Sequence, residues 1–266
     1  IKIESTNTSR VANTSPTAAS SGADLNGNAL LIACNELLVR LKSVAAATVN
    51  CNPGEIEIHD EKVLKNGSST DITWEKLVTT AFISRVSLSA QGHYATPKIW
   101  FDKTKEKGQP FAYHVYGTAV VVVRLDCLRG TYKIEKVQIV HDFGNSLNPS
   151  IDMGQIEGGV MQGIGWMTTE EVLFNKEGRM LTDSLFTYKV PDIYSAPEVL
   201  VCHALETEGP ELAIFKSKAV GEPPLMYGIG AFFALQNAVK AFNPQWQPDY
   251  DAPLTPEKIL MRLYAR

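Results

Sequence analysis

The chain has 266 residues, of which 44% are hydrophobic and 20% charged, and its formal net charge is −4. This length allows one large hydrophobic core or two small ones. The slight acidic excess and the lack of a basic run argue against a nucleic acid or an anionic membrane as a partner. No apolar stretch reaches the ~18 uncharged residues that a membrane-spanning helix needs. We therefore expect an ordinary globular chain.

The apolar periodicity predicts both helices and strands. In chain order we expect a strand at 1–5, a loop at 13–22, helices at 24–41 and 74–83, and a strand at 86–94. Next come strands at 119–123 and 132–143, a helix at 151–173, a mostly extended segment at 187–205, and helices at 226–242 and 256–264. The β-branched run 119–123 is typical of a buried strand and should pair with 132–143 as a hairpin. We predict an α+β fold with a mixed sheet packed by helices.

Cysteine and histidine spacing indicates no metal centre made by the protein. The four cysteines, at positions 34, 51, 127 and 202, form no Cys-x-x-Cys motif, and the five histidines show no ligand spacing. We expect free thiols in a reducing cytosol rather than an iron–sulfur or structural zinc site. Because the chain starts with Ile1 rather than methionine, we interpret residues 1–266 as a fragment or processed subunit that begins mid-domain.

One carboxylate stands between a glycine and a double proline, at Gly221-Glu222-Pro223-Pro224. Glycine permits backbone conformations that other residues resist, and proline fits the first turn of a helix. We expect Glu222 on a sharp turn just before the helix 226–242, where the helix end favours the ionised carboxylate. A rigid, ionised carboxylate suits a general base. The alternative is a glutamate that only complements the helix dipole.

Five glycines fall between residues 154 and 165 of a predicted helix. Each costs about 1 kcal/mol relative to alanine in a helix interior, so the missing side chains must serve a purpose. Either the helix packs tightly against a neighbour or it allows close approach of a bulky cofactor. Gln155 and Gln162 share one face of this helix, and Gln155 could offer its amide to a ligand. The glycine spacing is not that of a dinucleotide fingerprint.

A loop of small and hydroxyl-bearing residues, from Thr14 to Gly22, precedes the helix 24–41. Its backbone N–H groups could hold an anion beside the helix start. An ordinary capped loop is the alternative.

Taken together, these segments resemble the molybdenum-binding part of the molybdenum hydroxylase family. The matching segments are Thr14–Ser20, Asp24–Gly27, Arg85–Ser89, Ser146–Pro149, the glycine helix with Gln155 and Gln162, Thr187–Pro191 and Ser217–Pro224. Any one would be weak, but they occur in order over nearly the whole chain. The chain is identified as the C-terminal part of a molybdopterin-binding domain. Pro-Pro after the glutamate resembles xanthine dehydrogenases, whereas aldehyde oxidases tend to carry Gly-Glu-Ser-Gly.

The resemblance implies a role for each matched residue. Glu222 would be the general base that deprotonates a molybdenum-bound hydroxyl, and hydride from the substrate carbon would pass to a sulfido ligand. Gln155 would bind the pterin, and Gly221 would lie beside the metal centre. The residues that would surround the cofactor are Thr17, Ala18, Ala19, Ser20, Ser21 and Gly22. Of these, Ala18 and Ala19 would also lie near the substrate.

The implied reaction is oxidation of hypoxanthine and xanthine to urate with water as the oxygen source. The implied cofactors are a molybdopterin-type cofactor here and 2Fe-2S clusters and FAD on other domains or subunits. The implied partners are the purine, the rest of the molybdenum domain and those redox domains, in an oligomeric cytoplasmic enzyme. The purine-gripping residues of the family lie upstream of Ile1, so the fragment alone should be inactive. Two alternatives are an aldehyde oxidase-type or other N-heterocycle hydroxylase, and a non-catalytic scaffold.

Overall fold

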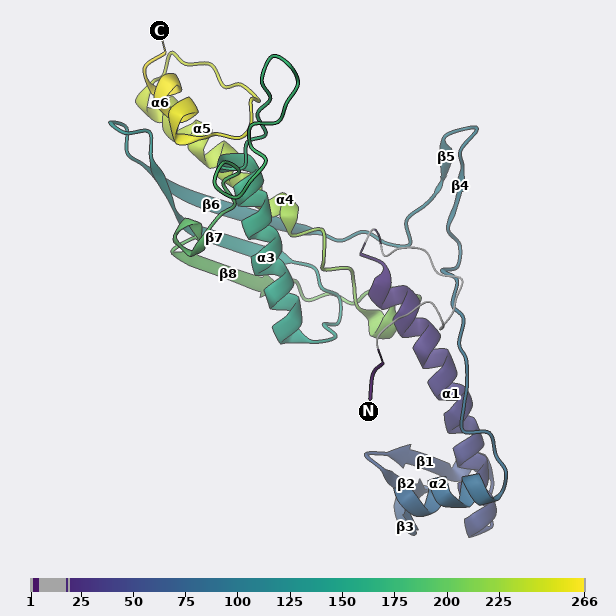
Figure 1. The fold of residues 1–266 in the computed structure, drawn as a ribbon. Coiled ribbons are helices and arrows are strands. Elements are labelled where there is room, and N and C mark those ends of the chain that lie inside the picture. Colours follow the sequence, from purple (N-terminus) through teal and green to yellow (C-terminus); the bar gives the residue numbers. More distant parts are fainter. Residues whose placement is uncertain (1, 5–17, 19, 266) are drawn as a thin grey trace. The chain divides into compact units, whose positions relative to one another are not determined.

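The structure, a computed structural model, describes residues 2–4, 18 and 20–265 (Figure 1). The chain divides into two compact units. The larger unit combines the residues up to Ser20 with residues 110–266, and the smaller unit is Ser21–Gln109. The smaller unit encloses one cluster of buried apolar side chains, and the larger unit encloses two.

The smaller unit packs two helices against a three-stranded antiparallel sheet with the order β1-β2-β3. Its elements are α1 (Gly22–Val49), β1 (Ile56–His59), β2 (Lys62–Lys65), β3 (Ser68–Thr73), α2 (Trp74–Ile83) and the hairpin β4 (Trp100–Asp102) and β5 (Lys107–Gln109). The α2 helix starts where the sequence predicts because the Thr73 hydroxyl accepts a hydrogen bond from the Lys76 N–H at 3.2 Å. The core of the smaller unit includes Leu41, Ile56 and Leu77.

Two strands expected in the first hundred residues are absent from the described part of the chain. Segment 86–94 forms no strand. Instead, the Arg40 guanidinium donates hydrogen bonds to the carbonyls of Ser87 at 3.0 Å and Ser89 at 2.8 Å. The backbone carbonyls of this segment are therefore bonded to a side chain rather than to a neighbouring strand. Residues 2–4 also lie outside any strand, and positions 1 and 5 are outside the described residues.

The larger unit contains a mixed sheet with the order β6-β7-β8, which confirms the predicted mixed α and β class. Its elements are β6 (Gly117–Leu125), β7 (Tyr132–His141), α3 (Pro149–Thr168), β8 (Val199–Ala204), α4 (Leu225–Gly228), α5 (Gly230–Phe242) and α6 (Pro256–Leu263). β6 and β7 form the predicted antiparallel hairpin, and β8 joins β7 in parallel. The α3 helix crosses the sheet (Figure 1), and its apolar side chains share one core with those of β7.

Three of the expected elements in this unit need correction. The run 119–123 is not buried on both faces: Val121 packs into the core, but Val120 is 60% exposed and Val122 is 42% exposed. The sheet is therefore covered on one face at this edge strand. Helix α3 ends at Thr168 rather than at 173, and the predicted helix 226–242 divides into α4 and α5 at Ile229.

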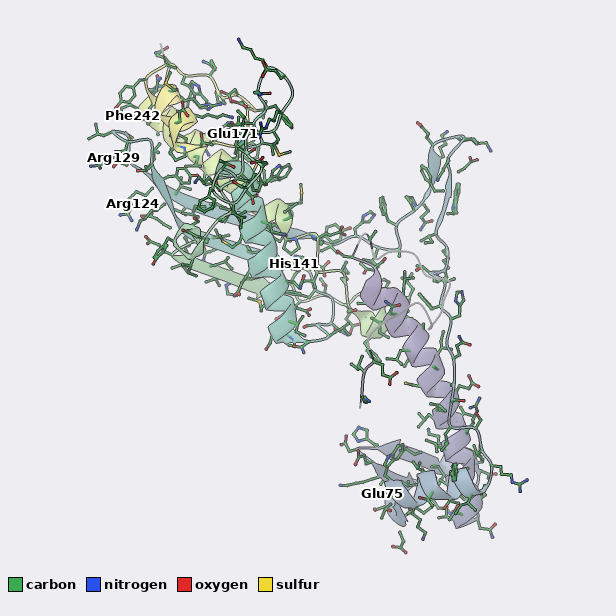
Figure 2. The ribbon with its side chains drawn as sticks, viewed as in Figure 1. Glu75, Arg124, Arg129, His141, Glu171 and Phe242 are labelled. Carbon is green, nitrogen blue, oxygen red and sulfur yellow. The ribbon has the colours of Figure 1, made fainter. Side chains whose placement is uncertain are left out.

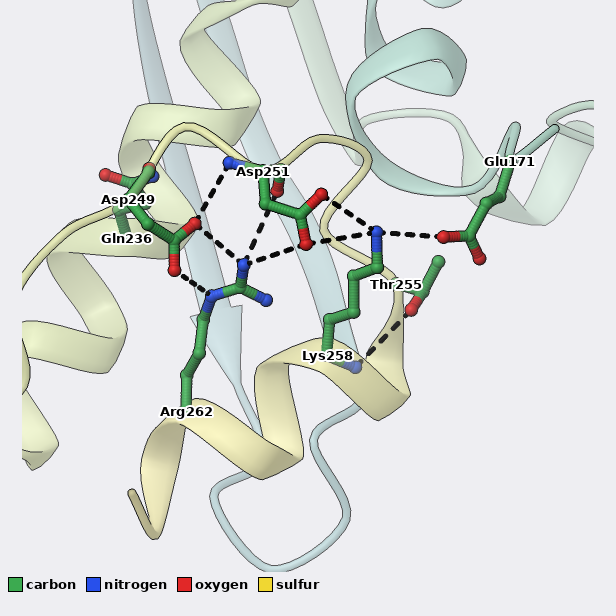
Figure 3. A network of polar contacts seen from close by, with 7 residues as sticks. All are labelled: Glu171, Gln236, Asp249, Asp251, Thr255, Lys258 and Arg262. Carbon is green, nitrogen blue, oxygen red and sulfur yellow. Dashed lines mark hydrogen bonds and ion pairs between the residues drawn. The ribbon is translucent and has the colours of Figure 1, made fainter. Parts of the chain in front are cut away.

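A network of ion pairs fastens α6 to the loop before it (Figure 3). Arg262 donates two parallel hydrogen bonds to Asp249, at 2.9 and 2.7 Å, and Lys258 contacts Glu171 at 2.8 Å. Glu171 belongs to the segment after α3, which ends at Thr168. Thr255 caps α6 at the start of the predicted helix 256–264, where its hydroxyl accepts a hydrogen bond from the Lys258 N–H. None of the described helices combines the length and hydropathy that crossing a bilayer requires.

Candidate active site

Glu222 occupies a turn just before a helix, as its glycine and prolines predict. The Leu225 N–H donates to the Glu222 carbonyl at 3.1 Å, and the Met226 N–H donates to the Pro223 carbonyl at 3.2 Å. Helix α4 follows at Leu225 and is four residues long. The Glu222 side chain is exposed, while Pro224 is buried. The carboxylate thus lies at the surface of the larger unit, and the turn that carries it is held by the buried Pro224.

Ser20 binds Glu222 at two points. The Ser20 hydroxyl donates to Glu222 Oε2 at 2.8 Å and accepts from the Glu222 N–H at 2.9 Å. Ser20 has a φ of 52°, in the left-handed region, so this serine completes a tight bend. The sequence placed Ser20 beside a cofactor and gave no sign of this contact. The loop residue therefore holds the orientation of the candidate base.

Gln155 and Gly221 lie beside this pair. A methyl group built on Gly221 would stand 3.1 Å from Ser20 Oγ and 3.8 Å from Gln155 Oε1. Gln155 is exposed near the start of α3, which begins after Asn148 caps it with a 3.3 Å bond from the Ile151 N–H. Four of the site residues expected from the sequence, Ser20, Gln155, Gly221 and Glu222, are therefore close together in the larger unit.

The glycines of α3 divide between two faces. A methyl on Gly159 would come within 2.8 Å of Pro224 Cβ, and one on Gly163 would collide with the Leu225 carbonyl oxygen. These glycines allow α3 to pack directly against the turn and helix that follow Glu222. By contrast, a methyl on Gly154 or Gly158 would meet no atom within 4 Å among the described residues. Both explanations left open by the sequence thus have glycines that fit them.

The remaining expected residues are placed less completely. Thr17 and Ala19 lie outside the described residues, and Ala18 is exposed. Ser21 and Gly22 belong to the smaller unit, where they stand at the start of α1. Their relation to a cofactor and, for Ala18 and Ala19, to a substrate stays a prediction.

A buried histidine lies behind the site. His141, which is labelled in Figure 2, stands at the end of β7. Its side chain is fully buried, and a 2.6 Å hydrogen bond joins its Nδ1 to the Tyr227 hydroxyl. Burial lowers the pKa of His141 and raises the pKa of Tyr227 to about 12, so both are neutral at pH 7. Any side chain at Gly117 would collide with that hydroxyl. The contact ties the sheet to α4, three residues after the prolines.

A second buried contact involves Asp142, the next residue. The Lys218 ammonium lies 2.5 Å from Asp142 Oδ2, and the Thr207 hydroxyl donates to Oδ1 at 2.5 Å. Burial alone would raise the pKa of Asp142, but the hydrogen bonds from Lys218, Thr207 and the Gly144 N–H outweigh it and hold that pKa below its usual value. Sequence reasoning missed this pair because its members are 76 residues apart.

The described residues can be tested for their fit to a pterin cofactor. They contain no group of three or more histidine, cysteine or acidic side chains arranged to hold a metal ion. A pterin cofactor carries metal ligands of its own, so the protein needs only polar groups that bind the pterin and a surface without bulky side chains. The bare face at Gly154 and Gly158, the exposed Gln155 amide and the exposed Gly221 offer these features. The residues therefore fit such a group.

Comparison with known protein families decides the membership. The model of the molybdopterin cofactor-binding domain matches residues 1–197. The chain belongs to this family. The resemblance drawn from the seven sequence segments is thereby confirmed.

Curated relatives include enzymes with two different names. Xanthine dehydrogenase/oxidase of Mus musculus is 41% identical over 266 residues, which cover 97% of this chain. Aldehyde oxidase 2 of Macaca fascicularis is 38% identical over 265 residues, which cover 98% of this chain. In both cases the chain spans only 18% of the length of the relative.

Solved structures share the fold of this domain. Quinoline 2-oxidoreductase from Pseudomonas putida 86 matches with a TM-score of 0.77 and 22% identity, over 94% of this chain and 31% of that one. Aldehyde oxidoreductase from Desulfovibrio gigas matches with a TM-score of 0.72 and 24% identity, over 95% of this chain and 24% of that one. At these identities the likeness shows the architecture alone, and it agrees with the predicted fold class.

Proposed function

We propose that this molybdopterin-binding domain is part of a hydroxylase that oxidises hypoxanthine and xanthine to urate, with Glu222 as the general base. The observation that carries the proposal is the convergence of Glu222, Ser20, Gln155 and Gly221 at one surface. Family membership and the similarity to xanthine dehydrogenase/oxidase support it. When bound, the molybdenum cofactor supplies the two-electron oxidation.

Each residue in this chain has a distinct task in the proposal. Glu222 removes a proton from the oxygen nucleophile that derives from water, and its carboxylate is aimed for this by the Ser20 hydroxyl. Gln155 contributes an amide to the pterin, and Gly221 leaves room beside the metal. Thr17, Ala18, Ala19, Ser21 and Gly22 complete the cofactor loop in the proposal, with Ala18 and Ala19 toward the substrate.

The purine assignment is supported by the residues that follow the base. Pro223 and Pro224 stand where aldehyde oxidases tend to carry serine and glycine, and Pro224 packs on Gly159. The relatives include an aldehyde oxidase of similar identity, so an aldehyde hydroxylase is the competing candidate. In the proposed enzyme, a cytoplasmic oligomer, 2Fe-2S clusters and FAD on other domains or subunits would accept the electrons that the molybdenum cofactor gains from the substrate.

The decisive experiment is Glu222→Gln in the intact enzyme. Glutamine keeps an acceptor for Ser20 but cannot take up a proton, so kcat with xanthine should fall by roughly 10²- to 10⁴-fold. Molybdenum and pterin contents should stay at the wild-type level. Glu257→Gln is the matched control because Glu257 is exposed on α6, outside the site. Near-normal turnover by a fully loaded Glu222→Gln enzyme would exclude Glu222 as the base.

Two further measurements separate the rival functions. A substrate panel on the wild-type enzyme should show higher kcat/KM for xanthine and hypoxanthine than for aldehydes, and the reverse order would favour the aldehyde hydroxylase. Metal analysis after expression with ample molybdenum should find the cofactor. A complex that lacks molybdenum under those conditions would instead support a non-catalytic scaffold.

A further inference from the structure

The polypeptide that carries Glu222 is fastened upstream by a buried ion pair. Lys218 stands four residues before Glu222, and its side chain is only 9% exposed. Its ammonium contacts Asp142, which is fully buried, at 2.5 Å and lies 5.5 Å from the centre of the Tyr116 ring. Asp142 directly follows β7. The ion pair therefore ties the start of the Glu222 turn to the central strand of the sheet.

Backbone hydrogen bonds set the register of the same stretch. The Lys218 N–H donates to the Phe143 carbonyl at 2.7 Å, and the Ala219 N–H donates to the Tyr113 hydroxyl at 3.0 Å. Val220 packs against the core of the sheet and α3. Every residue from 218 to 220 thus has a contact with the rest of the larger unit before the chain emerges at Gly221.

The turn is fastened again just downstream, on α3. Pro224 is buried, and the missing side chain of Gly159 lets it approach the helix axis closely. Between these two attachments, only Gly221 and Glu222 are exposed, and the other residues are half-buried. The position of the carboxylate is therefore determined by β7 on one side and by α3 on the other, and α3 also carries Gln155.

We infer that Asp142 and Lys218 are positioning residues for Glu222: their buried ion pair fixes the start of the turn that presents the base. This inference rests on the proposed role of Glu222. A buried ion pair can often be replaced by uncharged residues of similar volume without loss of stability. Its particular contribution here is directional, because a charge-assisted hydrogen bond defines the place of the Lys218 side chain more narrowly than apolar packing does.

The test uses the intact, molybdenum-loaded enzyme and compares two lysines. Lys218→Met should lower kcat per bound molybdenum by about 10- to 100-fold, the size of effect that small misplacement of a reacting group produces. KM should change little, because the substrate contacts are untouched. Lys258→Met is the matched control, since Lys258 also forms ion pairs but lies in the α6 network. It should leave kcat per molybdenum unchanged.

A double substitution guards against failure to fold. Lys218→Met leaves Asp142 as an unpaired buried charge, whereas Lys218→Met with Asp142→Asn removes both charges. The double variant should load molybdenum normally and still show the lowered kcat. Wild-type kcat per molybdenum in this variant would overturn the inference, because the ion pair would then serve stability alone.

Combination with the base variant separates this inference from the proposal beneath it. In a Glu222→Gln background, Lys218→Met should cause no further loss of kcat, because both changes act through the same carboxylate. Full additivity of the two losses would overturn the positioning role. If Glu222→Gln alone keeps normal turnover, the proposed function fails and the inference fails with it. If Glu222→Gln is inactive but Lys218→Met is normal, only the inference fails.

Discussion

The two faces of α3 use the same residue for different purposes. On one face, Gly159 and Gly163 are in close contact with the turn and helix that follow Glu222. On the other, Gly154 and Gly158 meet no atom within 4 Å among the described residues, and the exposed Gln155 directly follows Gly154 in the sequence. The packed face positions the candidate base, and the bare face leaves room for a ligand. Glycine-to-alanine substitutions on the two faces should therefore change the stability of the protein in opposite directions.

The largest effect is expected on the packed face. Gly163→Ala would drive a methyl group into the Leu225 carbonyl oxygen, so the backbone of α3 or α4 must move. Overpacking of this kind costs about 1–3 kcal/mol, occasionally more. The unfolding temperature of the intact enzyme should fall, and kcat per molybdenum should fall with it because α4 follows the Glu222 turn directly. An unchanged unfolding temperature would show that the two helices are not in close contact.

A smaller effect on the packed side should depend on pH. Burial lowers the pKa of His141, so the unfolded chain binds a proton near pH ~6.5 that the folded chain still excludes. The free energy of unfolding should therefore fall as pH drops below that value, by at most about 1.4 kcal/mol per pH unit, until the folded-state pKa is passed. Thermal unfolding of the intact enzyme at several pH values between roughly 7.5 and 5 would measure this loss of stability.

A pair of histidine variants isolates that contribution. His141→Asn should flatten the pH dependence, and His59→Asn, at a side chain that is 78% exposed, is the matched surface control. Equal slopes in the wild type and in His141→Asn would show that another group causes the loss of stability in acid.

The smallest change in stability is expected on the bare face, and with the opposite sign. Gly158→Ala adds a methyl group into open space and should stabilise the helix by up to about 1 kcal/mol. If the pterin lies against this face, molybdenum content should fall even though the protein becomes more stable. A variant that gains stability and keeps full molybdenum loading would show that the cofactor does not approach Gly158.

Local signals explain the elements that the sequence predicted well. Thr73 and Thr255 directly precede the predicted helices 74–83 and 256–264, and in the structure each caps its helix. The three short strands at 56–73 were missed. Their first turn has positive φ at Asp60 and Glu61. A glycine usually marks such a turn in a sequence, and none stands at these two positions. Segment 86–94 was wrong because alternation predicts an extended chain but does not name its partner.

The candidate site shows the same division. Glycine and proline around Glu222 restrict the backbone locally, so the turn before a helix could be expected from four residues alone. The contact between Ser20 and Glu222 spans 202 positions of the sequence, and the contact between Asp142 and Lys218 spans 76. No local sequence pattern encodes either contact. The packed and bare glycines of α3 are also identical in sequence. Backbone preference is a property of neighbouring residues, whereas the partner of a buried charge or of a missing side chain is chosen only when the sheet and helices pack.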